Sequence, residues 1–251
     1  MDVIPDRILR HLHETGVGVR VAVVRRLAVV PARGGSKGIP RKNLQVVAGE
    51  TLVARAVRCA VASRMFDEVM VSTDDDEVAA AGRAAGAAVP FLRGAAASGD
   101  RASSTDVLRD VLGTYAARGM DFDTVALLEP TSPMRISEDV VRSVTATEAD
   151  GWDAAVTLSQ VPLSYHPDKQ FRLGEDAAAV FFTEAGPTVV ARQQLVPTHI
   201  RNGMCYAVRA GSILVGGTIF GTRTRAILVS RPYVNIDSPE DLERARQMLG
   251  A

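Results

Sequence analysis

The stretch "LAVVPARGGSKGIPRKNL", Leu27 to Leu44, joins an apolar run to a loop that combines glycines with cations. A continuous apolar run of this length is typical of a strand buried on both faces. In the loop, Gly34 and Gly35 let backbone N–H groups approach an anion closely, while cationic side chains neutralise its charge. The cations of the loop are Arg33, Lys37, Arg41 and Lys42. The stretch therefore predicts a polyphosphate site directly after a buried strand.

Two common phosphate-binding loops do not fit this sequence. A Walker A loop requires GxxxxGK followed by Ser or Thr, whereas Lys37 here precedes Gly38 and no hydroxyl follows in register. The dinucleotide fingerprint GxGxxG fails because Gly34 and Gly35 are adjacent. The loop also carries more charge than a pyrophosphate at a helix N-terminus requires. The sequence thus argues against both classes and favours a triphosphate.

Apolar runs of strand length alternate with longer helical patterns over the first half of the chain. The strand-like runs cover residues 27–32, 68–73 and 125–131, and the helical patterns cover residues 50–63, 75–87 and 104–119. This alternation predicts an α/β fold with a doubly wound, mostly parallel sheet. In such sheets ligands bind beyond the carboxyl ends of the strands, so we expect the residues after each run to form the site.

The alternation breaks after the strand-like run at 153–161, where proline, aromatic and turn residues replace the helical period for about twenty residues. Segments of this kind often form subunit interfaces or lids. The pattern resumes at "MCYAVRAGSIL" and ends with a strand and a helix that begins at Ser238-Pro239-Glu240. We expect an N-terminal extension at 1–26, a main domain at 27–251 and, within it, an excursion at about 152–200.

Charge and cysteine content narrow the classes of partner. The 251 residues include 29 basic and 29 acidic side chains, so the formal net charge of zero gives no support for binding nucleic acid or an anionic membrane. No stretch offers the roughly 18 uninterrupted apolar residues of a membrane span. Cys59 and Cys205 stand alone without a metal-ligand spacing, which suits a reducing compartment and predicts a cytoplasmic protein.

Five segments carry a resemblance to a known family. They are "PARGGSKGIPRKN", "VSTDDDEVA", "LLEPTSPMR", "ARQQLVPTHIRNG" and "NIDSPEDL". In order and spacing, from about Leu27 to Leu249, the chain resembles the CMP-sialic acid synthetase (acylneuraminate cytidylyltransferase) family. The resemblance implies a Rossmann-like nucleotidyltransferase fold. It also implies that the anomeric hydroxyl of a 2-keto sugar acid attacks the α-phosphorus of CTP with the help of Mg²⁺, giving a CMP-sugar and pyrophosphate.

The resemblance further implies roles for individual positions. The catalytic set comprises Arg33, Lys37, Lys42 and Asp237. The CTP-binding set comprises Ala32, Gly34, Gly35, Ser36, Asn43, Arg93, Ser103 and Ser104. The sugar acid would contact Glu129, Arg192, Gln193, Arg201 and Asn202, and Mg²⁺ would be held by Asp237 and Asn235. The resemblance also implies a homodimer in which the excursion crosses to the site of the partner.

Two positions depart from the family pattern. Asn235 stands where a second aspartate is usual; in a strand it would share a face with Asp237, but an amide oxygen is a weaker Mg²⁺ ligand than a carboxylate. Glu129 stands where glutamine is common, and its charge would repel the carboxylate of an acidic sugar. Glu129 therefore accepts from sugar hydroxyls away from that carboxylate, or the substrate differs. The alternatives are 3-deoxy-manno-octulosonate, another nonulosonate, an acidic natural-product intermediate, or a non-catalytic nucleotide-binding homologue.

Overall fold

The computed structural model describes residues 24–36, 38–94, 99, 102–149 and 151–250. The N-terminal extension predicted for residues 1–26 therefore lies outside the described residues except for its last three positions, and Lys37 lies outside them as well. None of the described helices is long and apolar enough to cross a membrane.

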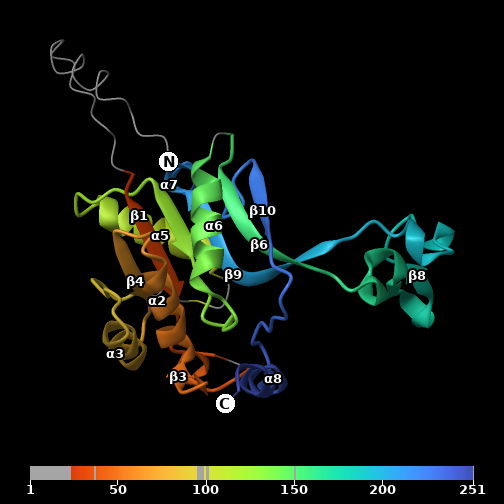
Figure 1. Cartoon of the computed structure of the whole chain (residues 1–251), viewed down its shortest axis with the longest axis horizontal. Helices are drawn as coiled ribbons and strands as arrows, with labels where there is room; N and C mark the ends of the chain where they lie inside the picture. The colour runs from red at the N-terminus through yellow and green to blue at the C-terminus, as the bar shows by residue number, and fades with distance from the viewer. Residues whose placement is uncertain (1–23, 37, 95–98, 100–101, 150, 251) are drawn as a thin grey trace, which may run out of the picture.

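A six-stranded sheet forms the centre of the fold, in the order β10-β6-β9-β5-β1-β4 (Figure 1). Its strands are β1 (Arg26–Pro31), β4 (Glu68–Ser72), β5 (Thr124–Leu127), β6 (Ala154–Gln160), β9 (His199–Arg209) and β10 (Thr224–Leu228). β9 runs antiparallel to its neighbours β5 and β6, and the other pairings are parallel. The prediction of a mostly parallel sheet is confirmed, although the direction of β9 was not predicted.

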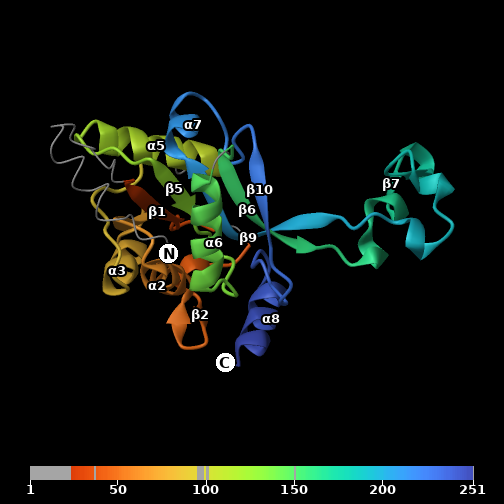
Figure 2. The same ribbon diagram turned by 45° about the horizontal axis from the view of Figure 1, so that its top comes forward.

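Helices cover both faces of this sheet (Figure 2). They are α2 (Leu52–Ser63), α3 (Asp76–Ala84) and α6 (Ser137–Glu148) on one face, and α5 (Ser104–Ala116) and α7 (Ala210–Leu214) on the other. Val57 of α2 and Val144 of α6 share one apolar cluster, whereas Leu108 of α5 and Ile213 of α7 belong to another. The sheet is therefore doubly wound, as predicted. The α6 helix had no counterpart among the predicted helical patterns.

Residues 161–198, termed the arm, leave the sheet between β6 and β9 and project away from it (Figures 1 and 2). The arm contains the antiparallel strands β7 (Phe171–Leu173) and β8 (Ala179–Phe181) and the short 3₁₀ turns Leu163–Tyr165, Pro167–Lys169, Glu175–Ala177, Gly186–Thr188 and Arg192–Gln194. Several of its apolar side chains are strongly exposed, with Leu173 at 76%, Val190 at 87% and Val196 at 75%. Such a surface typically contacts another molecule. The arm is shorter than the predicted excursion because Ala154–Gln160 forms β6 in the main sheet.

The C-terminal helix α8 (Pro239–Leu249) begins after Ser238, as predicted, and the side chain of Ser238 caps it. Leu242 of α8 packs with Ile236 and Val47 in a third apolar cluster. Val47 lies in the hairpin formed by β2 (Val46–Val47) and β3 (Glu50–Thr51). The residues that precede α8 are thereby fixed beside the loop that follows β1, here termed the β1 loop (residues 32–44).

The N-terminus of α3 contacts the β1 loop at Gly34. The N–H of Gly34 donates to the carboxylate of Asp74 at 2.8 Å. Asp75 caps α3 by accepting from the N–H groups of Glu77 and Val78. A Cβ at Gly34 would lie 2.5 Å from a carboxylate oxygen of Asp75. Glycine is therefore required here for the close approach of α3, and its N–H is engaged by the protein itself.

Gly34→Ala is expected to destabilise the fold by about 1–3 kcal/mol, because the added methyl group would displace Asp75 or the β1 loop. Gly35→Ala is the matched control, since a Cβ at Gly35 would meet no atom within 4 Å. Its effect should stay within about 0.5 kcal/mol. Urea unfolding followed by circular dichroism measures both variants, and equal losses of stability would contradict the contact with Asp75.

Candidate active site

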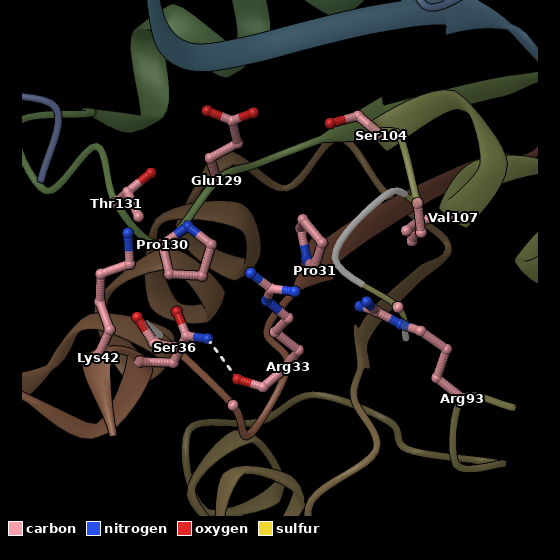
Figure 3. Close-up of a pocket in the computed structure, with 14 residues that line it drawn as sticks. Pro31, Arg33, Ser36, Lys42, Arg93, Ser104, Val107, Glu129, Pro130 and Thr131 are labelled. Atoms are coloured by element: carbon pink, nitrogen blue, oxygen red, sulfur yellow. Dashed lines mark hydrogen bonds between the residues drawn. The ribbon is translucent and has the colours of Figure 1, made fainter. Parts of the chain in front are cut away.

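The carboxyl ends of β1 and β5 open into a pocket of about 280 Å³ (Figure 3). The residues predicted for the site that line it are Arg33, Gly35, Ser36, Lys42, Asn43, Arg93, Ser104 and Glu129. Among its described lining residues, Glu129 is the one acid. Figure 3 shows Arg33 and Lys42 on one side of the pocket and Glu129 across from them. This arrangement suits a polyanion on the first side and hydrogen-bond donors on the second.

One hydrogen bond between its ends closes the β1 loop. Asn43 is buried and donates from Nδ2 to the carbonyl oxygen of Arg33 at 2.9 Å. The 3₁₀ turn η1 (Lys42–Leu44) includes Asn43, and Ala32 is buried at the other end of the loop. Arg33 and Lys42 therefore enter the pocket from opposite ends of one closed loop (Figure 3).

Arg41 precedes this turn with left-handed backbone angles, φ 53° and ψ 38°. Its guanidinium contacts the carboxylate of Asp75 at 2.7 Å and also that of Glu77. A hydrogen bond from the N–H of Val78, together with the Arg41 guanidinium, holds the pKa of Asp75 below its ordinary value. Arg41 thus stabilises the loop against α3 and does not line the pocket.

Lys42 connects the β1 loop with the residues before α8. Its Nζ lies 3.0 Å from the carbonyl oxygen of Ile236 and 3.2 Å from Oδ1 of Asp237. Asn235 faces the other carboxylate oxygen, with its Nδ2 3.4 Å from Oδ2 of Asp237. The side-chain oxygen of Asn235 accepts from the hydroxyl of Ser132 at 3.3 Å. Asn235 and Asp237 therefore lie side by side, although the segment that carries them is not a strand.

The donors around Asp237 limit the kind of metal that the site can hold. Asp237 offers one carboxylate, and its side chain is 72% exposed. No group of three or more His, Cys, Asp or Glu that could hold a metal occurs among the described residues. Mg²⁺ is commonly held by one or two carboxylates, with water and substrate phosphates completing its shell. The residues present therefore fit a Mg²⁺ ion whose other ligands are water and phosphate oxygens.

Arg93 is anchored at the carboxyl end of β4. Its Nε donates to the hydroxyl of Ser72 at 3.0 Å, and a second nitrogen donates to the Ser72 carbonyl. Burial lowers the pKa of Arg93. Ser103 caps α5, and its hydroxyl donates to Asp106 at 2.7 Å, so it is engaged outside the pocket. Of the two adjacent serines predicted for the site, Ser103 and Ser104, the structure places Ser104 at the pocket.

Glu129 follows β5 and presents its carboxylate to the pocket. Burial raises the pKa of Glu129, and the positive charges of Arg135 and Arg201 oppose this effect. A Cβ at Gly203 would lie 2.7 Å from Oε2 of Glu129, so the glycine makes room for the carboxylate. Within the described part of the chain, no residue donates a hydrogen bond to this carboxylate. Glu129 is therefore available to accept hydrogen bonds from a ligand.

Arg135 holds the backbone of Glu129, a role that the sequence did not reveal. It is buried and donates to the backbone carbonyl oxygens of Glu129 and Met204. Burial lowers the pKa of Arg135. Its position shortly after the strand-like run at 125–131 was the available signal, but nothing in the sequence separates a buried arginine from one that contacts a ligand.

Two residues predicted for the sugar acid lie on β9. Asn202 is fully buried and donates to the hydroxyl of Ser159 at 3.0 Å, so its side chain links β9 to β6. Arg201 is exposed, lies over the ring of Phe220 at 5.4 Å from its centroid, and acts electrostatically on Glu129. Arg201 therefore lies near Glu129, whereas the side chain of Asn202 makes a structural contact.

Arg192 and Gln193 lie in the arm, in the turn Arg192–Gln194. Both are exposed, and neither lines the pocket of its own chain. Figure 2 shows the arm extending away from the sheet that carries the pocket. The structure therefore does not bring these two residues together with Glu129 and Arg201.

Glu129→Gln is expected to stabilise the protein at neutral pH, because it removes a partly buried carboxylate whose pKa is raised. The folded state binds the proton of Glu129 more tightly than the unfolded chain does. The cost of ionising Glu129 is therefore absent below its ordinary pKa of 4.5 and grows as the pH rises through the raised folded-state pKa. The unfolding free energies of the wild type and Glu129→Gln across this pH range measure the difference in stability. A difference that does not change with pH would contradict the raised pKa of Glu129.

Comparisons with known proteins cover most of the chain. The cytidylyltransferase family model matches residues 27–248. CMP-N,N'-diacetyllegionaminic acid synthase from Legionella pneumophila is 30% identical over 220 residues, which cover 87% of this chain and 93% of that protein. Pseudaminic acid cytidylyltransferase from Campylobacter jejuni is 29% identical over 224 residues, which cover 89% of this chain and 95% of that protein.

A solved structure shares the fold. It is a CMP:2-keto-3-deoxy-manno-octonic acid synthetase in complex with CTP, with a TM-score of 0.69 and 20% identity, and the match covers 90% of this chain and 98% of that one. At this identity the likeness supports the fold alone. The sequence matches carry the assignment, and they confirm the resemblance seen in the motifs. The chain belongs to the cytidylyltransferase family.

Proposed function

We propose that this chain transfers a cytidylyl group from CTP to the hydroxyl of a 2-keto sugar acid and releases pyrophosphate. The observation that carries the proposal is the placement of Arg33 and Lys42 in one pocket, opposite the open carboxylate of Glu129. The cations on one side of the pocket suit a triphosphate. The carboxylate on the other side accepts hydrogen bonds and therefore suits a polyhydroxylated substrate. The relatives named for diacetyllegionaminic acid and pseudaminic acid support a substrate of this class.

The transfer is an in-line displacement at the α-phosphorus of CTP. The acceptor hydroxyl releases its proton to the solvent, its oxygen forms the new bond to the α-phosphorus, and the bond between the α-phosphorus and the pyrophosphate oxygen breaks. Arg33 and Lys42 neutralise the triphosphate and the departing pyrophosphate, and this positioning of charge supplies most of the acceleration. Asp237 would hold Mg²⁺, which supplies further charge neutralisation at the phosphate oxygens. Lys37 belongs to the same proposed set, although it lies outside the described residues.

The acceptor would lie between Glu129 and Arg201. An ionised carboxylate only accepts hydrogen bonds, so Glu129 would take hydroxyl or amide N–H groups of the sugar. The planar guanidinium fork of Arg201 would hold the substrate carboxylate. This division keeps the two negative charges apart. Because 3-deoxy-manno-octulosonate and the nonulosonates all offer hydroxyl groups and a carboxylate, a panel of acids identifies the acceptor.

We also propose a homodimer in which the arm of one protomer completes the site of its partner. The exposed apolar side chains of the arm, such as Leu173 and Val190, would be covered by the partner. Arg192 and Gln193 would then reach the acid substrate in the partner's pocket, since they do not line the pocket of their own chain. The cytoplasmic location expected from the two lone cysteines stays a prediction.

Pyrophosphate release tests the reaction. The protein would be incubated with Mg²⁺, each of the four nucleoside triphosphates and a panel of 2-keto sugar acids that includes 3-deoxy-manno-octulosonate. We expect release with CTP and at least one acid. Asp237→Asn should lower the rate by roughly 100-fold or more, because it removes a charge that acts in the transition state. No release with CTP and any acid would rule out the enzyme and leave a non-catalytic nucleotide-binding protein.

Co-expression of two inactive variants tests the shared site. Arg192→Ala damages the arm and Asp237→Asn damages the pocket, so each homodimer should be inactive. Half of the co-expressed dimers are mixed, and each mixed dimer holds one site in which both residues are intact. Activity should therefore recover to about one quarter of the wild-type value. Failure to recover, or a monomer in analytical ultracentrifugation, would exclude the arrangement.

A further inference from the structure

Asp237 is the carboxylate to which the donor chemistry assigns Mg²⁺, and in this structure it is already engaged by Lys42. We propose that the Lys42 ammonium binds the carboxylate of Asp237 in the free protein and releases it when a triphosphate binds. A divalent cation would then bind together with the nucleotide and not before it. This inference rests on the proposed function, because it takes Asp237 as the carboxylate that holds the metal.

Both carboxylate oxygens of Asp237 face nitrogen donors. Oδ1 lies 3.2 Å from Nζ of Lys42, and Oδ2 lies 3.4 Å from Nδ2 of Asn235. A divalent cation needs these oxygen lone pairs and is repelled by an ammonium at the same oxygen. Because the Asp237 side chain is 72% exposed, lack of access does not keep a cation away. The Lys42 ammonium, which competes for the same carboxylate oxygen, keeps the cation away.

Lys42 is free to change its partner without loosening the β1 loop. Its neighbour Arg41 is bound to the carboxylates of Asp75, which caps α3, and Glu77, which lies in α3, and both lie outside the pocket. Asn43, on the other side of Lys42, closes the loop through the Arg33 carbonyl. The backbone on both sides of Lys42 is therefore held by contacts that do not involve its ammonium.

A triphosphate would draw the ammonium away from Asp237. Lys42 lines the pocket together with Arg33 and Arg93, so phosphate oxygens bound there would compete for its Nζ with more negative charge than one carboxylate carries. Movement of Nζ towards the phosphates frees Oδ1 of Asp237 for a metal carried by the same phosphates. By linkage, removal of the ammonium must strengthen metal binding to the free protein.

Manganese binding to the free protein, followed by electron paramagnetic resonance, tests the proposal without nucleotide or sugar acid. Lys42→Met removes the ammonium and nearly preserves the length of the side chain. Lys42→Gln also removes the charge but keeps a donor that can face the Ile236 carbonyl. Both variants should bind Mn²⁺ about fivefold more tightly than the wild type, because a partly exposed ion pair contributes up to about 1 kcal/mol.

Two controls separate this effect from a general loss of positive charge. Arg201→Met removes a cation from the acceptor side of the site, where it lies over Phe220. This variant should change the Mn²⁺ affinity by less than about twofold, because its charge is exposed and screened. Addition of Asp237→Asn to Lys42→Met should abolish the gain, since the freed carboxylate is then absent.

Equal Mn²⁺ affinity in the wild type and both Lys42 variants overturns the proposal, and so does a gain that survives Asp237→Asn. Absence of Mn²⁺ binding in every variant also overturns it, because removal of the ammonium would then have exposed no metal position. The measurement uses neither CTP nor an acceptor. Failure of the proposed reaction and failure of this metal-ordering mechanism are therefore separate results.

Discussion

The hydrogen bond from Nδ2 of Asn43 to the carbonyl of Arg33, 2.9 Å long, is the constraint on which the site depends. Asn43 is buried, so opening this bond would leave polar groups unsatisfied at a cost of about 1–3 kcal/mol. The return of the β1 loop is therefore fixed, because this bond holds the two ends of the loop together. That return places Arg33 and Lys42 in one pocket, although they stand at opposite ends of the loop (Figure 3).

A second constraint lies in the turn after β5, where three arginines hold backbone carbonyl oxygens. The donor and acceptor pairs are Arg135 with Glu129, Arg55 with Pro133, and Arg231 with Met134. A guanidinium suits this task because its planar fork donates in fixed directions. The positive charge of Arg135 also opposes the rise that burial causes in the pKa of Glu129. The turn therefore fixes the backbone of Glu129, and Arg135 reduces the rise in the pKa of its carboxylate without reversing it.

The elements that could be predicted from the sequence are those whose burial leaves a local trace. Periodicity was enough for β1, β4 and β5 and for α2, α3 and α5, because burial on one or two faces sets the spacing of apolar residues. The pattern of β9 shows that it is buried but not which strands it pairs with, so its antiparallel direction was missed. The polar sequence "SEDVVRSVTATE" hid α6, which buries a narrow stripe that includes Ser143 and Thr147.

The residue types of the site could be predicted from the sequence. The sequence did not show which of these residues face the pocket and which hold the protein together. Arg41 and Lys42 look equivalent in the sequence, yet the left-handed backbone at Arg41 lets the two bind different acids. Asp75, which Arg41 contacts, is 34 residues away along the chain, and Asp237, which Lys42 contacts, is 195 residues away. A cationic side chain can bind a phosphate of the ligand only if the phosphate can replace the carboxylate to which the side chain is bound. Arg41 is bound by two acids outside the pocket, whereas Lys42 lines the pocket and is bound by one exposed acid, so the exchangeable charge belongs to Lys42.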